Sequence, residues 1–163
     1  MPGPEKARLL RRIRLWVAFF IVALALSGIT AFPLVHELNL LASWFPPEAT
    51  GNLARWIFRV RDALVATQRA YPFLAYGTDW LAFGHLVIAA FFVGLWRDPV
   101  RNVFILHAGL AACAGIIPLA FICGTIREIP IYWRLIDCSF GIFGALPLLY
   151  VRSLIRQLEV EPT

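Results

Sequence analysis

The residues best suited to chemistry are His85 and Asp137, which lie inside two long apolar segments. His85 follows Trp80 by five residues, and Asp137 follows Trp133 by four. Tryptophan gathers at membrane interfaces and a helix rises about 1.5 Å per residue, so both side chains are expected roughly 6–8 Å below the interface. We therefore predict that His85 and Asp137 approach to within hydrogen-bonding distance or that of one bridging water.

Three further polar residues are expected in a shallower charged layer, nearer the membrane interface. Asp79 lies one to two turns before His85, Arg134 lies one turn before Asp137, and His36 follows the first apolar segment. The candidate polar site therefore consists of His85, Asp137, Asp79, His36 and Arg134. Ionisable groups inside membranes are commonly functional, as proton relays or ligands. The alternative is structural, because a His–Asp pair can also simply join two membrane helices.

Haem is the one cofactor that the histidines suggest, and only weakly. A b-type haem takes two imidazoles on opposite sides of the iron, or one imidazole and an open position. His85, His107 and His36 are the candidate ligands, although the depths expected for His85 and His107 differ by roughly 10 Å. His36 matches His85 better in depth but can lie in solvent. We assign no cofactor from the sequence.

No metal site is predicted, because the chain has neither an HExxH nor a CxxC motif. The three cysteines are Cys113, Cys123 and Cys138. Cys113 lies in the middle of an apolar segment, where a thiol usually packs as a small apolar group. A disulfide between Cys123 and Cys138 is conceivable in an oxidising compartment and is left open.

The elements that must position these residues are membrane helices. The chain has 163 residues, of which 60% are hydrophobic and 15% charged, against about half and a quarter in soluble domains. The apolar residues are concentrated in segments long enough to cross roughly 30 Å of hydrocarbon. We predict an all-α fold, a four-helix integral membrane bundle forming a single membrane domain. The predicted spans are residues 15–35, 79–96, 100–123 and 131–150.

Residues 36–78 form the long connection between the first two predicted spans. Within it, Asn52–Ala70 has apolar residues at helical spacing and arginines on the remaining positions, which is typical of an amphipathic surface helix. The expected helix ends follow from local signals. Thr78 is a good N-cap for the second span, with Asp79 in its first turn. Asp98 and Pro99 are expected to cap and begin the third span.

Each predicted span carries small residues at three-to-four spacing, which lets membrane helices approach closely. The candidate polar residues share these positions, so they are expected between helices. The stripes are Ser27, Gly28 and Ala31; Thr78, Ala82, His85 and Ala89; His107, Ala111, Ala114 or Gly115, and Pro118; and Asp137, Gly141 and Gly144.

The basic residues predict an orientation. The net charge is +5, and nine Lys and Arg residues lie on the side of the termini against six on the other side. Basic residues favour the cytoplasmic side, so both termini are expected in the cytoplasm and the amphipathic helix outside. The basic N-terminal segment is typical of attraction to anionic lipid. We expect the lipid bilayer as partner, and not nucleic acid.

Four stretches resemble a group of small, uncharacterised bacterial four-span membrane proteins. They are SGITAFPL (27–34), YPFLAYGTDWLAFGH (71–85), RDPVRN (97–102) and DCSFG (137–141). The resemblance covers most of the chain. It implies the four-span layout and a bacterial cytoplasmic membrane, and it implies no activity.

Three functions are compatible with the sequence. The first is a non-enzymatic membrane protein or small subunit of a larger membrane assembly, with a membrane protein or a second copy as partner. The second is a redox or proton-handling protein that uses His85 and Asp137, with or without haem. The third is a small transporter or a lipid-active membrane enzyme that uses the outer polar residues.

Overall fold

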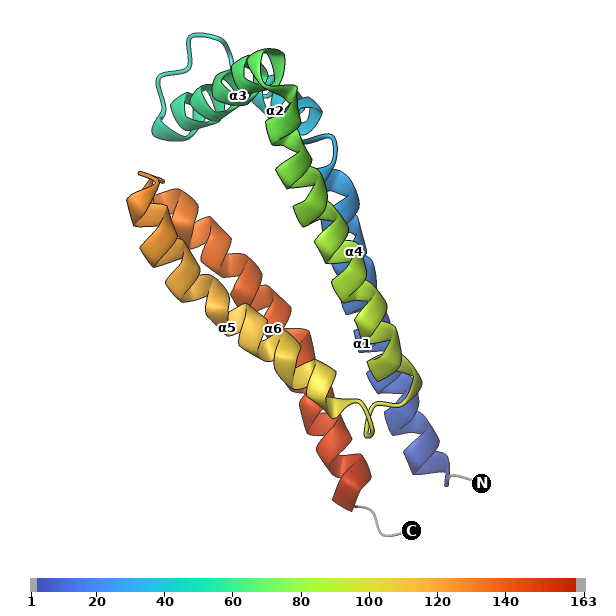
Figure 1. The fold of residues 1–163 in the computed structure, drawn as a ribbon. Helices are drawn as coiled ribbons and strands as arrows, with labels where there is room; N and C mark the ends of the chain where they lie inside the picture. The colour runs from blue at the N-terminus through green and yellow to red at the C-terminus, as the bar shows by residue number, and fades with distance from the viewer. Residues whose placement is uncertain (1–2, 161–163) are drawn as a thin grey trace. The chain divides into compact units, whose positions relative to one another are not determined.

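The computed structural model describes residues 3–160, and this part of the chain consists of helices joined by short connections, with no strand. Figure 1 shows the elements in chain order. They are α1 (Pro4–Ala31), α2 (Leu34–Ala42), α3 (Asn52–Ala70), a short 3-10 helix (Pro72–Leu74), α4 (Ala75–Arg97), α5 (Val103–Ile126) and α6 (Ile131–Val160).

Four of the helices, α1, α4, α5 and α6, are long and apolar enough to cross a membrane. Their most apolar windows have a mean hydropathy of 1.6 to 2.1. Large apolar side chains remain exposed along them, including Phe19, Phe91, Phe104 and Phe143. Such an outer surface suits lipid and not water. The fold is therefore that of an all-α four-helix membrane bundle, as predicted.

The connection between the first two spans contains the expected amphipathic helix. Helix α3 covers Asn52–Ala70, the same bounds as predicted. Ala54 and Ile57 are buried on one side of it, while Arg55 and Arg59 are exposed. Pro33 stands before α2 and separates it from α1, because a proline lacks the N–H that would continue the first helix.

Two predicted helix starts are wrong. Thr78 is not the N-cap of the second span, since Pro72 begins a 3-10 turn that leads directly into α4 at Ala75. Proline is well suited to the first position of a helix because its φ is already helical. Helix α4 therefore begins about one turn earlier than expected, and Thr78 and Asp79 lie inside its first turns.

The third span does not begin at Pro99 either. The Asp98 carboxylate accepts a hydrogen bond from the Arg101 backbone N–H (3.1 Å), so it closes a turn of its own. Asn102 is the N-cap of α5. Its side-chain amide donates to the carbonyl oxygens of Gly94 (3.1 Å) and Asp98 (3.0 Å) at the end of α4. Both carbonyls also accept a backbone N–H, from Asp98 (3.0 Å) and from Asn102 itself (3.1 Å), so the amide adds a second hydrogen bond to each.

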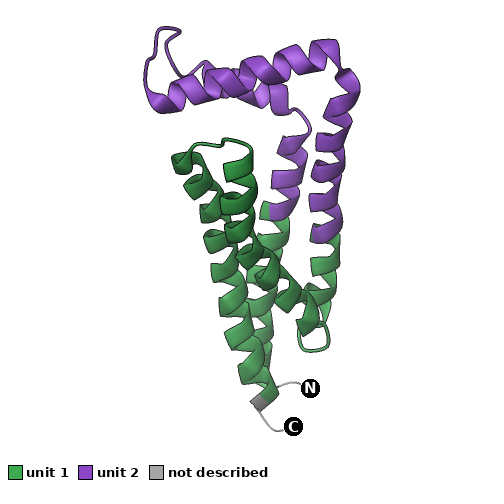
Figure 2. Cartoon of the chain, turned by 60° about the vertical axis from the view of Figure 1, so that its left-hand side comes forward, with its two compact units in different colours: residues 1–23, 89–163 green, residues 24–88 purple. Residues whose placement is uncertain are grey.

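The residues fall into two compact units, which Figure 2 colours separately. Unit 1 contains residues 1–23 and 89–163, and unit 2 contains Leu24–Ile88. The division passes through α1 and α4, so each of these helices contributes one end to each unit. The expectation that the chain is a single membrane domain stays a prediction.

Unit 1 holds a buried aliphatic core to which all four spans contribute. Its most deeply buried members have at most 1% of their surface exposed, and close packing between the helices is what stabilises such contacts inside a membrane. They are Ile13 and Val17 of α1, Leu95 of α4, Leu106 of α5, and Leu148, Val151 and Ile155 of α6.

Helices α5 and α6 pack against each other, and glycines on α6 allow the two helices to approach closely. A Cβ atom at Gly141 would lie 2.6 Å from the Cys113 carbonyl oxygen, and one at Gly144 would lie 3.2 Å from the Cys113 sulfur. The predicted small-residue stripe of Asp137, Gly141 and Gly144 therefore includes the glycines that face the neighbouring helix.

Candidate functional site

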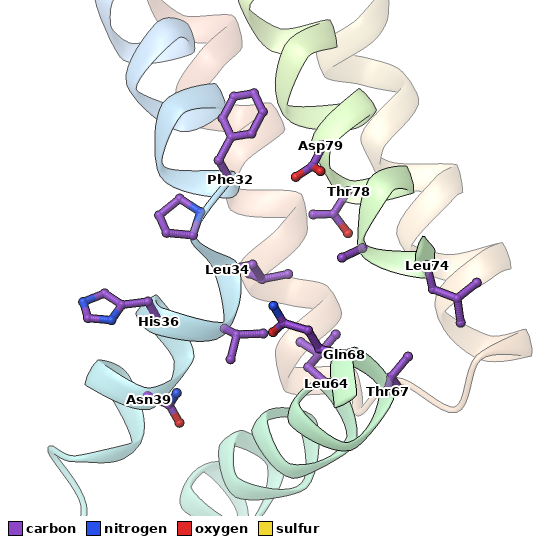
Figure 3. A pocket seen from close by; sticks show the side chains of 13 residues that line it. Phe32, Leu34, His36, Asn39, Leu64, Thr67, Gln68, Leu74, Thr78 and Asp79 are labelled. Carbon is purple, nitrogen blue, oxygen red and sulfur yellow. The ribbon is translucent and has the colours of Figure 1, made fainter. Parts of the chain in front are cut away.

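A pocket of about 440 Å³ lies within unit 2. It is formed by the turn between α1 and α2, helix α2, the second half of α3, the last residue of the 3-10 helix and the beginning of α4 (Figure 3). Its walls are largely apolar, from Phe32, Leu34, Leu64 and Leu74. Helix α2 packs on α3, so most of the lining comes from helices, while Phe32 and Pro33 come from the turn before α2.

The polar part of the lining includes Asp79 and Thr78 of α4, and both residues are half-buried. In Figure 3 their side chains point from α4 toward the first residues of α2. Within residues 3–160, the Asp79 carboxylate has no hydrogen bond or ion pair, and the one salt bridge joins Arg61 to Asp62. A partly buried carboxylate gains most from a donor that neutralises it.

His36 lines the same pocket, so the structure brings together two of the five candidate residues, His36 and Asp79. The His36 side chain is exposed, and its ring points away from Asp79 in Figure 3. His36 therefore belongs to the rim of the pocket, where it can meet a ligand but does not contact the carboxylate.

Sequence reasoning missed the contribution of α2 and α3. Thr67 and Gln68 of α3 and Asn39 of α2 also line the pocket. A signal was present, because Thr67 and Gln68 follow Leu64 by three and four residues and so continue the apolar stripe of α3. The apolar face of an amphipathic helix is the face that packs on the rest of the protein. Polar residues on that face therefore indicate a polar patch at the packing surface.

This set of groups can hold a donor-rich group on an apolar stem. Asp79 offers a charged acceptor, Thr78, Thr67, Gln68 and Asn39 offer hydroxyl and amide groups, and the leucines and Phe32 can cover methylenes. Within the described chain, no three His, Cys, Asp or Glu side chains cluster as a metal site would need.

His85 lies deeper in α4 and is half-buried. Its Cβ faces Gly28 of α1, where an added Cβ would lie only 2.9 Å away. Its ring Nδ1 lies 2.8 Å from the Leu81 carbonyl oxygen, to which an Nδ1–H group donates. In the neutral ring that tautomer leaves the Nε2 lone pair available to a proton donor or a metal ion.

Arg134 of α6 has a structural role that the sequence did not indicate. Its Nε donates to the Ile129 carbonyl oxygen (2.6 Å) and its guanidinium donates to the Thr125 hydroxyl (2.8 Å). Its side chain also packs on Gly124, where a Cβ would lie 2.9 Å from the arginine Cδ. Arg134 therefore fastens the turn between α5 and α6.

Asp137 is half-buried on α6 in unit 1, and it makes no hydrogen bond to another described residue. His85 belongs to unit 2. Their approach to one another stays a prediction.

His107 is exposed on unit 1, as are Ala111, Ala114 and Gly115 of the same predicted stripe. The face of α5 that meets α6 carries Cys113, Ile116 and Gly124 instead. All three cysteines are free, with Cys123 exposed and Cys138 buried. The Cys123–Cys138 disulfide that the sequence left open is therefore not formed in this structure.

No protein-family model, curated protein or solved structure matches the chain.

Proposed function

We propose that this chain is a non-enzymatic membrane protein that serves as a small subunit of a larger membrane assembly. The observation that carries the proposal is the unit 2 pocket, with its half-buried and unpaired Asp79. A basic side chain of a partner protein, lysine or arginine, fits this chemistry. Its charged end would bond Asp79, and its methylenes would cover Phe32, Leu34 and Leu64.

The shape of the pocket favours a side chain carried by a protein over a free small molecule. Small-molecule sites usually bury about 70–90% of their ligand, whereas this pocket is partly open to solvent. A group held by a folded partner needs less enclosure, because the partner covers the rim. The exposed residues Asn39 and Gln68 at that rim supply the polar contacts typical of an interface edge.

The proposed location is the bacterial cytoplasmic membrane, with both termini in the cytoplasm. The number of basic residues near the termini and in the 98–102 turn supports this orientation. It places the pocket on the extracytoplasmic side, where a periplasmic or membrane partner can reach it.

Site-specific photocrosslinking in cells tests the proposal. A photoreactive amino acid at Gln68, in the pocket, should give one discrete crosslinked protein band, identified by mass spectrometry. The matched control is Ala66, which is exposed two residues earlier on α3 and does not line the pocket. Asp79→Asn should remove the Gln68 adduct and leave the amount of folded chain unchanged. Equal crosslinking from Gln68 and Ala66, or adducts that survive Asp79→Asn, would contradict it.

His85 supports a second candidate, a redox or proton-handling protein. The observation is the bond from His85 to the Leu81 carbonyl oxygen, which fixes the ring and leaves Nε2 free to bind. The Nε2 nitrogen can coordinate haem iron or accept a proton in a relay, and these are the two roles to test. An absorption spectrum and metal analysis of the detergent-purified chain separate the proposals. A Soret band lost in His85→Ala would favour this second function, with haem bound.

A further inference from the structure

A second groove, of about 480 Å³, lies wholly within unit 1 where the first half of α1 passes the end of α4. Its α1 residues recur every three or four positions, so they form one stripe over three turns, roughly 16 Å long. The lining consists of Ala7, Leu10, Arg11, Arg14, Leu15 and Ala18 of α1, with Trp96 of α4.

Arg14 holds a fixed positive charge in this groove. Its Nε donates to the Trp96 carbonyl oxygen (3.3 Å), and a terminal nitrogen donates to the Arg97 carbonyl oxygen (3.5 Å). The guanidinium carbon also lies 5.6 Å from the centroid of the Trp96 ring. These contacts orient the guanidinium while leaving N–H groups for a further acceptor, because the group carries five donors.

Arg11 stands one turn before Arg14 on the same stripe. It is exposed and makes no hydrogen bond or ion pair with another described residue. Positions three apart on a helix have Cβ atoms about 5–6 Å apart. The two guanidinium groups can therefore reach one tetrahedral anion between them, and a phosphate suits their donors in number and geometry.

Arg11 and Arg14 lie in the middle of the stripe, and toward the centre of α1 the groove is apolar. Leu15 is 63% exposed, and Ala18 leaves room beside it because its side chain is small. These residues belong to the apolar part of α1, which is long enough to cross a membrane. The groove thus joins a cationic middle section to an exposed apolar surface, with the amphipathic ring of Trp96 at the level of Arg14.

We propose that this groove binds one anionic phospholipid. Its phosphate lies between Arg11 and Arg14, and one acyl chain lies over Leu15 and Ala18. Charge complementarity selects an anionic over a zwitterionic head group, because no carboxylate of the described residues pairs with either arginine. The proposal does not depend on the pocket of unit 2 or on its partner.

Native mass spectrometry of the full chain in detergent tests the proposal. The protein is titrated with phosphatidylglycerol and with phosphatidylcholine of the same acyl chains. Phosphatidylglycerol should bind more tightly, and Arg11→Gln should weaken it about tenfold, as the loss of one charge-assisted hydrogen bond would. The matched control is Arg12→Gln, which removes the same charge from the next position, outside the groove; it should change binding less than about twofold.

A third variant tests the acyl chain. Ala18→Phe fills the apolar end without changing charge and should also weaken phosphatidylglycerol binding. Soluble glycerol phosphate, which has no acyl chain, should not compete. Equal losses in Arg11→Gln and Arg12→Gln would overturn the proposal in favour of general electrostatic attraction. Competition by glycerol phosphate would overturn it in favour of a simple anion site.

Discussion

Gly28 of α1 lies directly against His85 of α4. A Cβ atom at Gly28 would come within 2.9 Å of the His85 Cβ and 2.8 Å of the Ala82 carbonyl oxygen. Both are fixed atoms of α4, so neither can rotate out of the way. The absence of a side chain at Gly28 therefore sets how closely the two helices approach within unit 2, and it holds His85 in its half-buried position.

Gly28→Ala should lower the free energy of unfolding by about 1–3 kcal/mol, because the added methyl group must push the helices apart. Titration of the detergent-solubilised chain with a denaturing detergent, followed by circular dichroism, measures the change. Gly84→Ala is the control, since a Cβ there meets nothing within 4 Å. It should be neutral or stabilise by about 0.5–1 kcal/mol. Equal effects of the two substitutions would show that the contact is not tight.

The turn between α5 and α6 supports a second prediction. Glu128 follows the C-cap residue of α5 and has a φ of 55°. Ile129 N–H donates to the Gly124 carbonyl oxygen, and Glu128 N–H donates to that of Thr125. This is the bonding of a Schellman motif, whose left-handed position favours glycine. Glu128→Gly should raise the free energy of unfolding by up to about 1 kcal/mol.

The control for this turn is its neighbour Arg127, which has an ordinary φ of −93°. Arg127→Gly should stabilise nothing and should cost a few tenths of a kcal/mol up to about 1 kcal/mol in chain entropy. Both variants can be measured by the same unfolding titration. A loss of stability in Glu128→Gly would mean that the glutamate side chain contributes more than its backbone strain costs.

Asn102 supports a third prediction, because its amide bonds two carbonyl oxygens at the end of α4. Asn102→Ala should lower the free energy of unfolding by about 1–2 kcal/mol, since the two hydrogen bonds that its part-buried amide adds to these carbonyls are lost. Asn39→Ala removes the same amide from an exposed position and should change stability by less than about 0.5 kcal/mol. A similar loss in both would contradict the capping role of Asn102.

Much of the fold could be predicted from the sequence. The long apolar runs leave few alternatives to membrane helices, and the amphipathic spacing of Asn52–Ala70 identifies α3 to the residue. The starts of α4 and α5 could not be predicted, because competing caps decide them. Pro72 begins a 3-10 turn that continues into α4, so the helix has already started where Thr78 would cap it. At α5, the Asn102 side chain donates to the Gly94 carbonyl oxygen. Such bonds depend on the geometry of the turn and not on residue type alone.

The candidate site could be predicted less well. Counting residues along the helices predicts a similar membrane depth for Asp79 and His36, and both line one pocket in the structure. Depth does not say which face of a neighbouring helix is opposite, so the roles of Thr67, Gln68 and Asn39 were missed. Arg134 was expected in a charged layer because it is an arginine near an interface. Its bonds to Ile129 and Thr125 follow from the tight turn instead.

The last prediction tests the proposed orientation, on which the extracytoplasmic position of the unit 2 pocket rests. Arg101 and Arg127 are both exposed, one in the turn after α4 and the other at the end of α5. In a chain whose three cysteines are replaced by alanine, a single cysteine is placed at either position. A maleimide that does not cross membranes is then added to spheroplasts, which leaves the cytoplasmic side protected.

Arg127→Cys should react in intact spheroplasts, and Arg101→Cys should react only after lysis, because opposite ends of the α5 span face opposite sides of the membrane. The reverse pattern would place both termini outside and the unit 2 pocket in the cytoplasm. The partner that supplies a basic side chain to Asp79 would then have to be sought among cytoplasmic proteins, and Gln68 crosslinking would identify it there. Reaction of both cysteines before lysis would mean that α5 does not cross the membrane.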